Sequence, residues 1–374
     1  MQSTAYPLSI QPLLFTSEDL SPCFFFQPTD DELCFMEVWE NLVSAMPAPV
    51  RYDEGRSRTG RPGHTLLSVL AVHAVKLYFQ EKTMAAARDR LLSSSNLRTI
   101  TGVAEVPSLS VISKKTDTLI DLVDFSSILA SICSSFYKDR LVCHLSIDST
   151  IAEAREKPVK AEKPGKRKRG RKRKGSDEPT IAEEKEQLHD LMENGGVDEF
   201  LSTLEHRCSV TGKKNSKGNM EWSIGYKAHL AVDDNGIIVA HHVTGASVHD
   251  SQVAIPLMRM ADRRCDYLYA LMDGGYTSER IETFAHSIGK VPIIDRHADR
   301  NGNKKEMEPC KAERYKARTT VERTNSELKE CFLPGKLYSR GKKGIFQIEL
   351  SILMLDIKKI SARLRAESIA QKTA

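Results

Sequence analysis

From Leu141 onward the chain alternates short apolar runs with segments of helical length, and this order restricts the fold more than any other feature of the sequence. Leu141–Asp148 (LVCHLSID) has strand character, and residues 222–232 and 236–243 form a second and third strand around an Asn-Gly turn signal. The elements predicted next are a helix over 250–262, a strand over 267–273, a helix over 278–287, a strand over 291–294 and a closing amphipathic helix over 347–364. We therefore expect an α/β domain with a mixed sheet flanked by helices.

The first part of the chain carries helix signals and little strand propensity. Thr29-Asp30-Asp31-Glu32 is a capping-box pattern that opens a helix running to about Met46, and an apolar helix is expected over 66–79. Further helices are expected over 84–92, 111–123 and 125–137. The predicted units are an irregular arm over 1–28, an all-helical domain over 29–138 for DNA binding or dimerisation, the α/β domain over 139–366 and a flexible tail over 367–374.

A basic insertion follows the first strand, at about residues 152–220. We expect it to be largely disordered because it is poor in apolar residues, although residues 182–204 have the pattern of one or two charged helices and 211–219 that of a basic loop. Its densest run contains eight cations: Lys166, Arg167, Lys168, Arg169, Arg171, Lys172, Arg173 and Lys174. A flexible polycation binds the phosphates of any duplex without reading its sequence. A nuclear import signal has the same composition, but little else in the sequence is eukaryotic.

Residues 315–329 (YKARTTVERTNSELK) contain no Gly or Pro, and we expect them to form a continuous α-helix. At about 100° per residue, one face gathers a phenol, two cations and a carboxylate: Tyr315, Arg318, Glu322 and Lys329. A second face, about a third of a turn away, gathers apolar residues for packing on the sheet: Ala317, Val321 and Leu328. The polar face is suited to a metal ion or a phosphate, and the alternative is a solvated face with an ordinary i,i+4 ion pair.

Three acids occupy positions where they can meet. Asp148 and Asp273 each end a predicted strand, and Glu322 lies on the helix just described. Carboxylate oxygens at such a point would bind Mg²⁺ or Mn²⁺, and two ions about 3.5–4 Å apart can act on a phosphodiester. The alternative is that both aspartates only cap strand ends or turns.

Taken together, these residues resemble the DDE transposases of bacterial insertion sequences, in the group with a Y-R-E-K signature. The pattern Tyr-x2-Arg-x3-Glu-x6-Lys fits Tyr315, Arg318, Glu322 and Lys329, and Asp148 and Asp273 precede it in the family's order. Further pieces that resemble the family are RPGH (61–64), GYKAH (225–229), VHDSQ (248–252) and DGGY (273–276). The resemblance covers roughly residues 55–365 and implies a ribonuclease H-like catalytic domain, which agrees with the predicted order of strands and helices.

The resemblance also implies roles for single residues. Asp148, Asp273 and Glu322 would bind two catalytic Mg²⁺ or Mn²⁺ ions, and Tyr315, Arg318 and Lys329 would hold DNA phosphates near the cut. Lys227 is a weaker candidate for DNA binding, because a lysine here can equally face solvent. His229 is a weaker candidate for a role in the site, because a histidine here can equally be packed in the core. The implied partners are double-stranded DNA, as terminal inverted repeats and target, and a second copy of the chain in a paired-end complex.

The implied activity is cleavage of element ends and joining of their 3′-hydroxyls to target DNA. A related nuclease that cuts without joining is one alternative, and a non-catalytic, transposase-derived DNA-binding regulator is another, although the three acids argue against it. The eight cysteines are scattered without metal-binding spacing, and no segment resembles a signal peptide or a bilayer span. We therefore expect a cytoplasmic, nucleoid-associated bacterial protein without a membrane partner.

Overall fold

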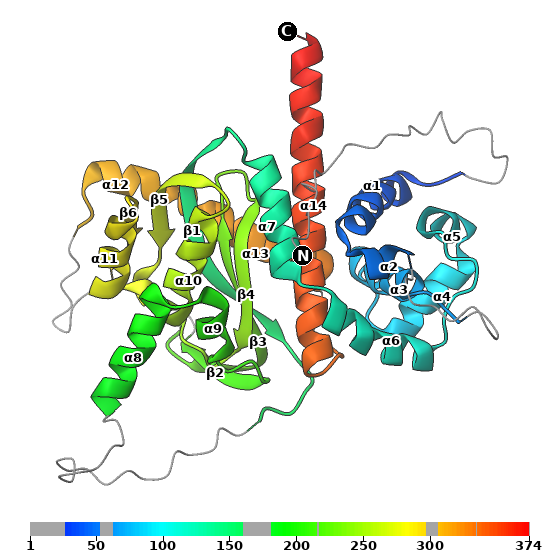
Figure 1. Ribbon diagram of the computed structural model, residues 1–374, viewed down its shortest axis with the longest axis horizontal. Helices are drawn as coiled ribbons and strands as arrows, with labels where there is room; N and C mark the ends of the chain where they lie inside the picture. The colour runs from blue at the N-terminus through cyan, green and yellow to red at the C-terminus, as the bar shows by residue number, and fades with distance from the viewer. Residues whose placement is uncertain are drawn as a thin grey trace, which may run out of the picture.

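The computed structural model describes residues 27–52, 63–159, 181–214, 217–296, 306–333 and 335–373. An N-terminal helical region and a mixed α/β domain lie side by side, and one long helix, α14 (Lys342–Thr373), runs between them (Figure 1). Nearly all of the predicted N-terminal arm, and the basic run 166–174, lie outside the described residues.

The N-terminal region is all-helical, as predicted. Its helices are α1 (Asp30–Ala45), α2 (Ala48–Tyr52), α3 (Leu66–Tyr78), α4 (Met84–Ser93), α5 (Ser95–Thr101), α6 (Leu109–Leu122) and α7 (Phe125–Phe136). The capping box is confirmed, because the Glu32 amide donates to Thr29 Oγ1 at 3.2 Å and the Thr29 amide donates to Glu32 Oε2 at 3.0 Å. The short helices α2 and α5 were not predicted, since five and seven residues are too few to show a helical period.

Membrane-spanning character is limited within the described ranges. No single helix there combines the length and the apolar composition needed to cross a bilayer, and the bent pair α6–α7 meets that test only jointly, on length and composition.

The α/β domain is built on one six-stranded mixed sheet. Its strands are β1 (Leu141–Glu153), β2 (Ser209–Lys214), β3 (Met220–Val232), β4 (Ile238–Gly245), β5 (Asp266–Met272) and β6 (Val291–Ile294). The central strand β1 pairs antiparallel with β3 and parallel with β5, and β5 pairs parallel with β6. Strand β3 pairs with β2 along its first half and with β4 along its second. The predicted mixed sheet flanked by helices is confirmed.

Helices cover both faces of this sheet. Helix α10 (Ser251–Asp262) packs on β3 and β4 with α11 (Glu279–Ser287) beside it, whereas α13 (Thr319–Glu327) packs on β1 and β3. They lie on opposite faces, because Asp148 contacts α13 while Lys227, on the alternate face, contacts the residue before α10.

Within the insertion at 152–220, expected to be largely disordered, the charged helices predicted over 182–204 are confirmed as α8 (Ile181–Asn194) and α9 (Val197–Ser202). Two other expectations were wrong. The expected basic loop 211–219 supplies part of strand β2, which pairs with β3. Helix α14 continues through most of the expected tail, where Arg140 makes two contacts of 2.8 and 2.9 Å with Glu367. These segments are held in regular structure by contacts with residues distant in the chain, and local composition does not reveal such contacts.

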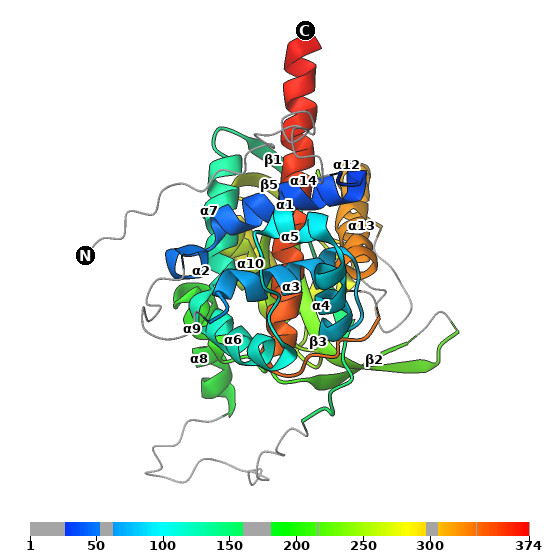
Figure 2. The ribbon, with the colours of Figure 1, turned by 90° about the vertical axis from the view of Figure 1, so that its right-hand side faces the viewer.

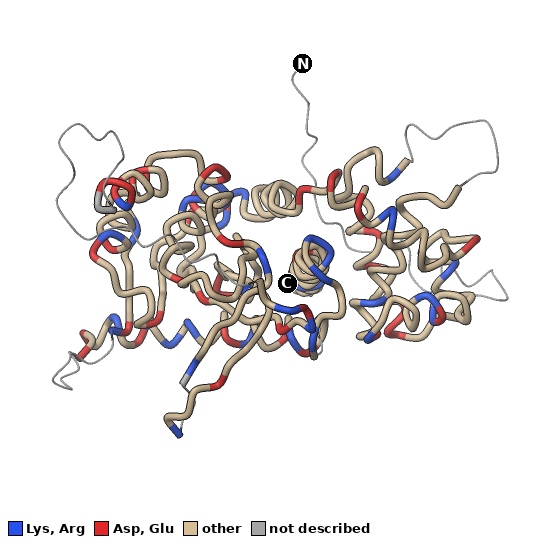
Figure 3. The backbone as a smooth tube through the Cα atoms, turned by 90° about the horizontal axis from the view of Figure 1, so that it is seen from below, with Lys and Arg blue, Asp and Glu red and all other residues tan. Residues whose placement is uncertain are grey.

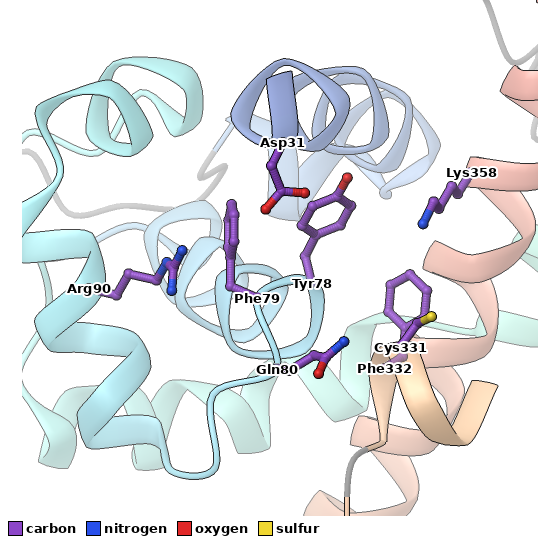
Figure 4. A pocket seen from close by; sticks show the side chains of 8 residues that line it. All are labelled: Asp31, Tyr78, Phe79, Gln80, Arg90, Cys331, Phe332 and Lys358. Carbon is purple, nitrogen blue, oxygen red and sulfur yellow. The ribbon is translucent and has the colours of Figure 1, made fainter. Parts of the chain in front are cut away.

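Helix α14 is the element that joins the two halves of the molecule. It packs against α1, α3, α6 and α7 on one side and against β4 on the other, and nearly all of its apolar residues between Phe346 and Ile360 are buried. A small cavity of about 260 Å³ lies beside it, where Tyr78 and Phe332 meet edge to face at 6.3 Å and Arg90 lies 4.2 Å from the Phe79 ring centre (Figure 4). The domains therefore meet through aromatic packing around one helix.

A buried acid on α14 makes the stability of this interface dependent on pH. Asp356 is fully buried, its Oδ1 accepts the Ile238 amide at 2.6 Å, and burial raises its pKa to about 8. Because this folded-state pKa lies above the unfolded value of about 4, its contribution to stability is complete below about pH 4 and is lost as the pH rises to about 8. We expect Asp356→Asn to flatten this loss, measured by urea unfolding at pH 5 and pH 8. Equal losses in both proteins would contradict the assignment.

Candidate active site

Two of the predicted acids lie at the carboxyl edge of the parallel strands. Asp273 directly follows β5, and Asp148 lies two residues beyond Ser146, the last β1 residue that pairs with β5. The prediction that Asp148 ends its strand is wrong, because β1 continues to Glu153 through its pairing with β3. The parallel pairing of β1 with β5, however, ends before Asp148. Asp148 therefore still lies at the carboxyl edge of the parallel strands, where ligands bind in such sheets.

The helix predicted over 315–329 is present but is not a uniform α-helix. It consists of α12 (Pro309–Tyr315), a 3₁₀ turn η2 (Lys316–Arg318), α13 and a π-helical turn η3 (Leu328–Phe332). Val321 and Leu328 are fully buried as predicted, whereas Ala317 is partly exposed. Each change of winding rotates the residues that follow, so the four signature residues do not share one straight face.

Arg318 lies at the centre of the acids. Its Nη2 is 3.2 Å from Asp148 Oδ1 and 3.8 Å from Asp273 Oδ2, and its Nη1 donates to Glu322 Oε1 at 2.6 Å. The structure thus brings Asp148, Asp273 and Glu322 together around one guanidinium, and we call these four residues the acidic site. Burial raises the pKa of Asp148, and the charge of Arg318 opposes that rise.

Tyr315 adds a neutral donor beside the acidic site. Burial raises the pKa of its phenol to about 12, and the nearby Asp295, Asp273 and Glu322 carboxylates act in the same direction while Arg318 opposes them. The hydroxyl is therefore protonated at physiological pH and can donate a hydrogen bond to an anionic ligand.

Lys329 is separated from the acids by the winding change after α13. It is exposed on η3 and lines an open groove of about 650 Å³, bordered by the end of β1 and the start of the segment before α14. The residues that line this groove include Ile151, Glu153, Ser223, Lys329 and Lys336. Lys329 therefore faces this groove.

Asn325 was missed by the sequence analysis. Its Nδ2 donates to Asp148 Oδ2 at 3.0 Å, and the whole residue is 7% exposed. Its Oδ1 is buried and has no hydrogen-bond partner among the described residues. The available signal was its position three residues after Glu322, which places both side chains on neighbouring turns of the same helix side.

Asp250 and Tyr276 also lie near the acids, and both were noticed only as parts of motifs. The charge of Asp250 raises the pKa of Asp148, and the carboxylates of Asp250, Asp148 and Asp273 all act on Tyr276. Tyr276 is 1% exposed, and its hydroxyl has no partner in the part of the chain that the structure describes. Asp250 and Tyr276 therefore belong to the electrostatic surroundings of the acids.

The structure does not bring Lys227 or His229 to the acids. Lys227 is 8% exposed, donates to the Val248 carbonyl at 2.8 Å and pairs with Asp250 at 2.9 Å. His229 is fully buried, lies 2.9 Å from Thr244 Oγ1, and burial lowers its pKa to about 3. Both lie on the sheet face opposite Asp148, so His229 has the packed, neutral character of the alternative interpretation, and Lys227 is directed at Asp250 instead of at solvent.

The acidic site has the donor chemistry of a Mg²⁺ or Mn²⁺ site. Within the described ranges, no three or more Asp, Glu, His or Cys side chains are arranged as they stand to hold a metal ion. The three carboxylates and the unpartnered Asn325 Oδ1 are nevertheless hard oxygen donors, which these cations prefer. In the structure the guanidinium of Arg318 supplies the positive charge between them, in the place that a cation would take.

Comparison with known proteins bears on this site. Residues 197–355 match the family model described as a transposase DDE domain. The match covers less than half of the chain and includes Asp273, Arg318 and Glu322, while Asp148 precedes it. No curated protein matches the chain. Among solved structures, the chain is similar to that titled "Cryo-EM structure of piggyBac transposase synaptic complex with hairpin DNA", at 9% identity and a TM-score of 0.43, over 90% of this chain and 76% of that one.

Proposed function

We propose that this protein is a DDE transposase of the bacterial insertion-sequence group with the Y-R-E-K signature. It would bind the ends of its element, cleave DNA strands and join the 3′ ends to a target. The observation that carries the proposal is the meeting of Asp148, Asp273 and Glu322 around Arg318, from three separate segments of the chain. The match of residues 197–355 to the transposase DDE domain supports it independently.

In this proposal the acids hold the catalytic cation and the cationic side chains hold DNA. Asp148, Asp273 and Glu322, with Asn325 Oδ1 as a further oxygen, would bind Mg²⁺ or Mn²⁺, with two ions expected. When bound, such ions activate a water or a 3′-hydroxyl and stabilise the leaving oxygen of a phosphodiester.

The residues around the acids would position the substrate. Arg318 would exchange its carboxylate partners for a DNA phosphate, which its planar fork can bind through two hydrogen bonds. The neutral Tyr315 phenol would donate to a neighbouring phosphate oxygen, and Lys329 would hold the strand in the groove. Because a transposition reaction must bring two ends together, we expect two copies of the chain to act in one complex, in the bacterial cytoplasm.

A joining assay tests this function against its alternatives. The substrate is a pair of duplexes taken from the ends of the DNA that carries the reading frame, with a supercoiled plasmid as target, in Mg²⁺. We expect both nicked ends and ends joined to the plasmid. Nicks without joined product would indicate a nuclease, and DNA binding without either product would indicate a regulator.

The contact of Asn325 with Asp148 predicts a role in cleavage for a residue outside the four signature positions. We expect Asn325→Ala to reduce cleavage about 10- to 100-fold, the usual cost of losing a residue that orients a metal ligand, because Asp148 loses its amide donor. The matched control is Ser326→Ala, at the exposed neighbouring position of the same helix, which should cleave at the rate of the unaltered protein. Equal rates for both variants would remove Asn325 from the site.

A further inference from the structure

A two-stranded ribbon projects from the sheet, in a region that the sequence analysis described only as a basic loop. It consists of β2 and the first half of β3, residues 209–214 and 220–225, which pair with each other antiparallel. The central strand β1 ends at Glu153, opposite Gly225, so among the described strands β2 alone pairs with β3 before that point. Figures 2 and 3 show the ribbon extending away from the body of the α/β domain.

One face of the ribbon is apolar and exposed. Met220, Trp222 and Ile224 alternate along β3, and Val210 lies directly across from Ile224, so these four side chains share a face. Trp222 is 68% exposed, Met220 46%, and Val210 and Ile224 37% each. Exposed apolar groups in such a cluster mark a contact surface more often than they occur by chance.

Gly212 holds the indole of Trp222 in place. It lies across from Trp222, and a Cβ added to it would come within 2.9 Å of the Trp222 ring and 2.8 Å of the Met220 methyl. The absence of a side chain therefore lets both groups lie against the ribbon backbone. The indole thus lies against the ribbon backbone and exposes most of its surface.

The net positive charge of the ribbon favours a polyanion as its partner. The sequence 209–224 contains three lysines, Lys213, Lys214 and Lys217, and a single acid, Glu221. An apolar face of this kind flanked by lysines is complementary to DNA, whose phosphates take the cations while an aromatic ring contacts bases or sugars.

The base of the ribbon borders the groove next to the acidic site. Ser223 lines that groove together with Lys329, and its Oγ lies 3.1 Å from Glu153 Oε1. Asp148 and Glu153 belong to the same strand, so at about 3.3 Å per residue they are separated by roughly 16 Å. A duplex engaged at the acids and lying along the groove would therefore reach the base of the ribbon, beside Ser223.

We propose that the ribbon is a DNA-binding arm, in which Trp222 inserts into a groove of the duplex bound at the acidic site. This inference rests on the proposed function, because it takes DNA as the substrate. A two-stranded ribbon fits the major groove of B-form DNA, and apolar side chains of such arms wedge against base steps. Lys214, paired with Met220, and the neighbouring lysines contact the flanking phosphates, and Lys329 contacts the same DNA nearer the cut.

Tryptophan fluorescence tests this arm directly, because the chain contains only Trp39 and Trp222. Trp39 is 4% exposed in α1, so Trp39→Phe leaves the exposed Trp222 as the sole reporter. With a duplex from the ends of the element, we expect quenching of the Trp222 emission and protection from acrylamide. If Trp39→Phe does not fold, the difference between the unaltered protein and Trp222→Ala gives the same signal.

Binding measurements complete the test. We expect Trp222→Ala to weaken DNA binding about tenfold and Lys214→Ala, at the position paired with Met220, to lower the salt dependence of binding by about one phosphate contact. Leu188→Ala, on the exposed side of α8, is the control and should bind as the unaltered protein does.

Two results would overturn the arm. The first is Trp222 emission that does not change when DNA is added, while Mg²⁺-dependent cleavage is intact. The proposed function would then stand, and only the assignment of the ribbon as a DNA-binding arm would be wrong. The second is emission that changes with protein concentration alone, with sedimentation showing that Trp222→Ala breaks a dimer, since the ribbon would then be an interface between two copies. Failure of the proposed function is recognised separately, by the absence of Mg²⁺-dependent cleavage from the unaltered protein.

Discussion

Replacing Glu322 with glutamine is expected to reduce Mg²⁺-dependent strand cleavage on the order of 10³-fold or more, the scale of losing a group that acts only as part of a catalytic unit. The substitution keeps the length of the side chain and removes the charge. The Glu322 side chain is 56% exposed and contacts Arg318 at 2.6 Å on the surface of its helix, so the fold should be retained. Single-turnover nicking of an end duplex, with DNA binding measured in parallel, is the appropriate experiment.

Glu313→Gln is the matched control for this substitution. Glu313 belongs to the same helical segment, is exposed and pairs with Lys316 on the surface, away from Asp148 and Asp273. We expect its cleavage rate to stay within about twofold of the unaltered protein, since exposed ion pairs contribute little. Cleavage by Glu322→Gln at that same rate would exclude Glu322 from catalysis.

Replacing Arg318 with alanine is expected to have opposite effects on metal binding and on cleavage. Without DNA, the guanidinium competes with any cation for the three carboxylates, and both Arg318 and Asp148 are largely buried, with side chains 12% and 18% exposed. An adjacent opposite charge shifts a carboxylate by about one to three pKa units, so we expect Mn²⁺ to bind about tenfold or more tightly to Arg318→Ala. Cleavage should fall about 10²-fold, because the phosphate loses a positioned cation.

Electron paramagnetic resonance of free Mn²⁺ measures the first effect and single-turnover nicking the second. Arg323→Ala is the control, because Arg323 is exposed on the same helix α13. Weaker Mn²⁺ binding by Arg318→Ala would show that Arg318 supports the metal site and does not compete for it. Thermal unfolding adds a check, since Mn²⁺ should restore the stability that the variant loses when its three carboxylates repel one another.

The sequence was most informative where local pattern and chain order agree. The alternation of strands and helices after Leu141 was enough to predict the mixed sheet, and the Asn-Gly turn was enough to predict the β3–β4 hairpin. Asp148 and Asp273 could be singled out because each follows an apolar strand run, and Glu322 because it is the carboxylate on a cationic helix face. Their meeting point depended on strand order, which the predicted elements already restricted.

The remaining features depend on contacts between distant residues. Residues 149–153 have no distinctive strand pattern, and their pairing with β3 is what extends β1 beyond Asp148. The 3₁₀ and π turns around α13 cannot be read from the spacing of Tyr315 and Lys329, because that spacing was interpreted with uniform α-helical geometry. Asn325 was overlooked because its importance lies in a contact with a residue far away in the sequence.

The projecting ribbon was missed for a related reason. Residues 211–219 are rich in lysine and glycine, and by composition they resemble a loop. Their partner strand is the start of β3. The exposed position of the Trp222 ring becomes apparent only when the pairing places Gly212 opposite it. A short strand stabilised by one long neighbour leaves little trace in its own composition.

Direct titration of a divalent cation tests the central claim, that the three acids hold the catalytic metal. Mn²⁺ would be titrated into four proteins, each in complex with the end duplex: the unaltered protein and its Asp148→Asn, Asp273→Asn and Glu322→Gln variants. Free Mn²⁺ would be followed by electron paramagnetic resonance. The account predicts saturable binding to the unaltered protein and at least tenfold weaker binding in each variant. Equal Mn²⁺ affinity in all four proteins would contradict it.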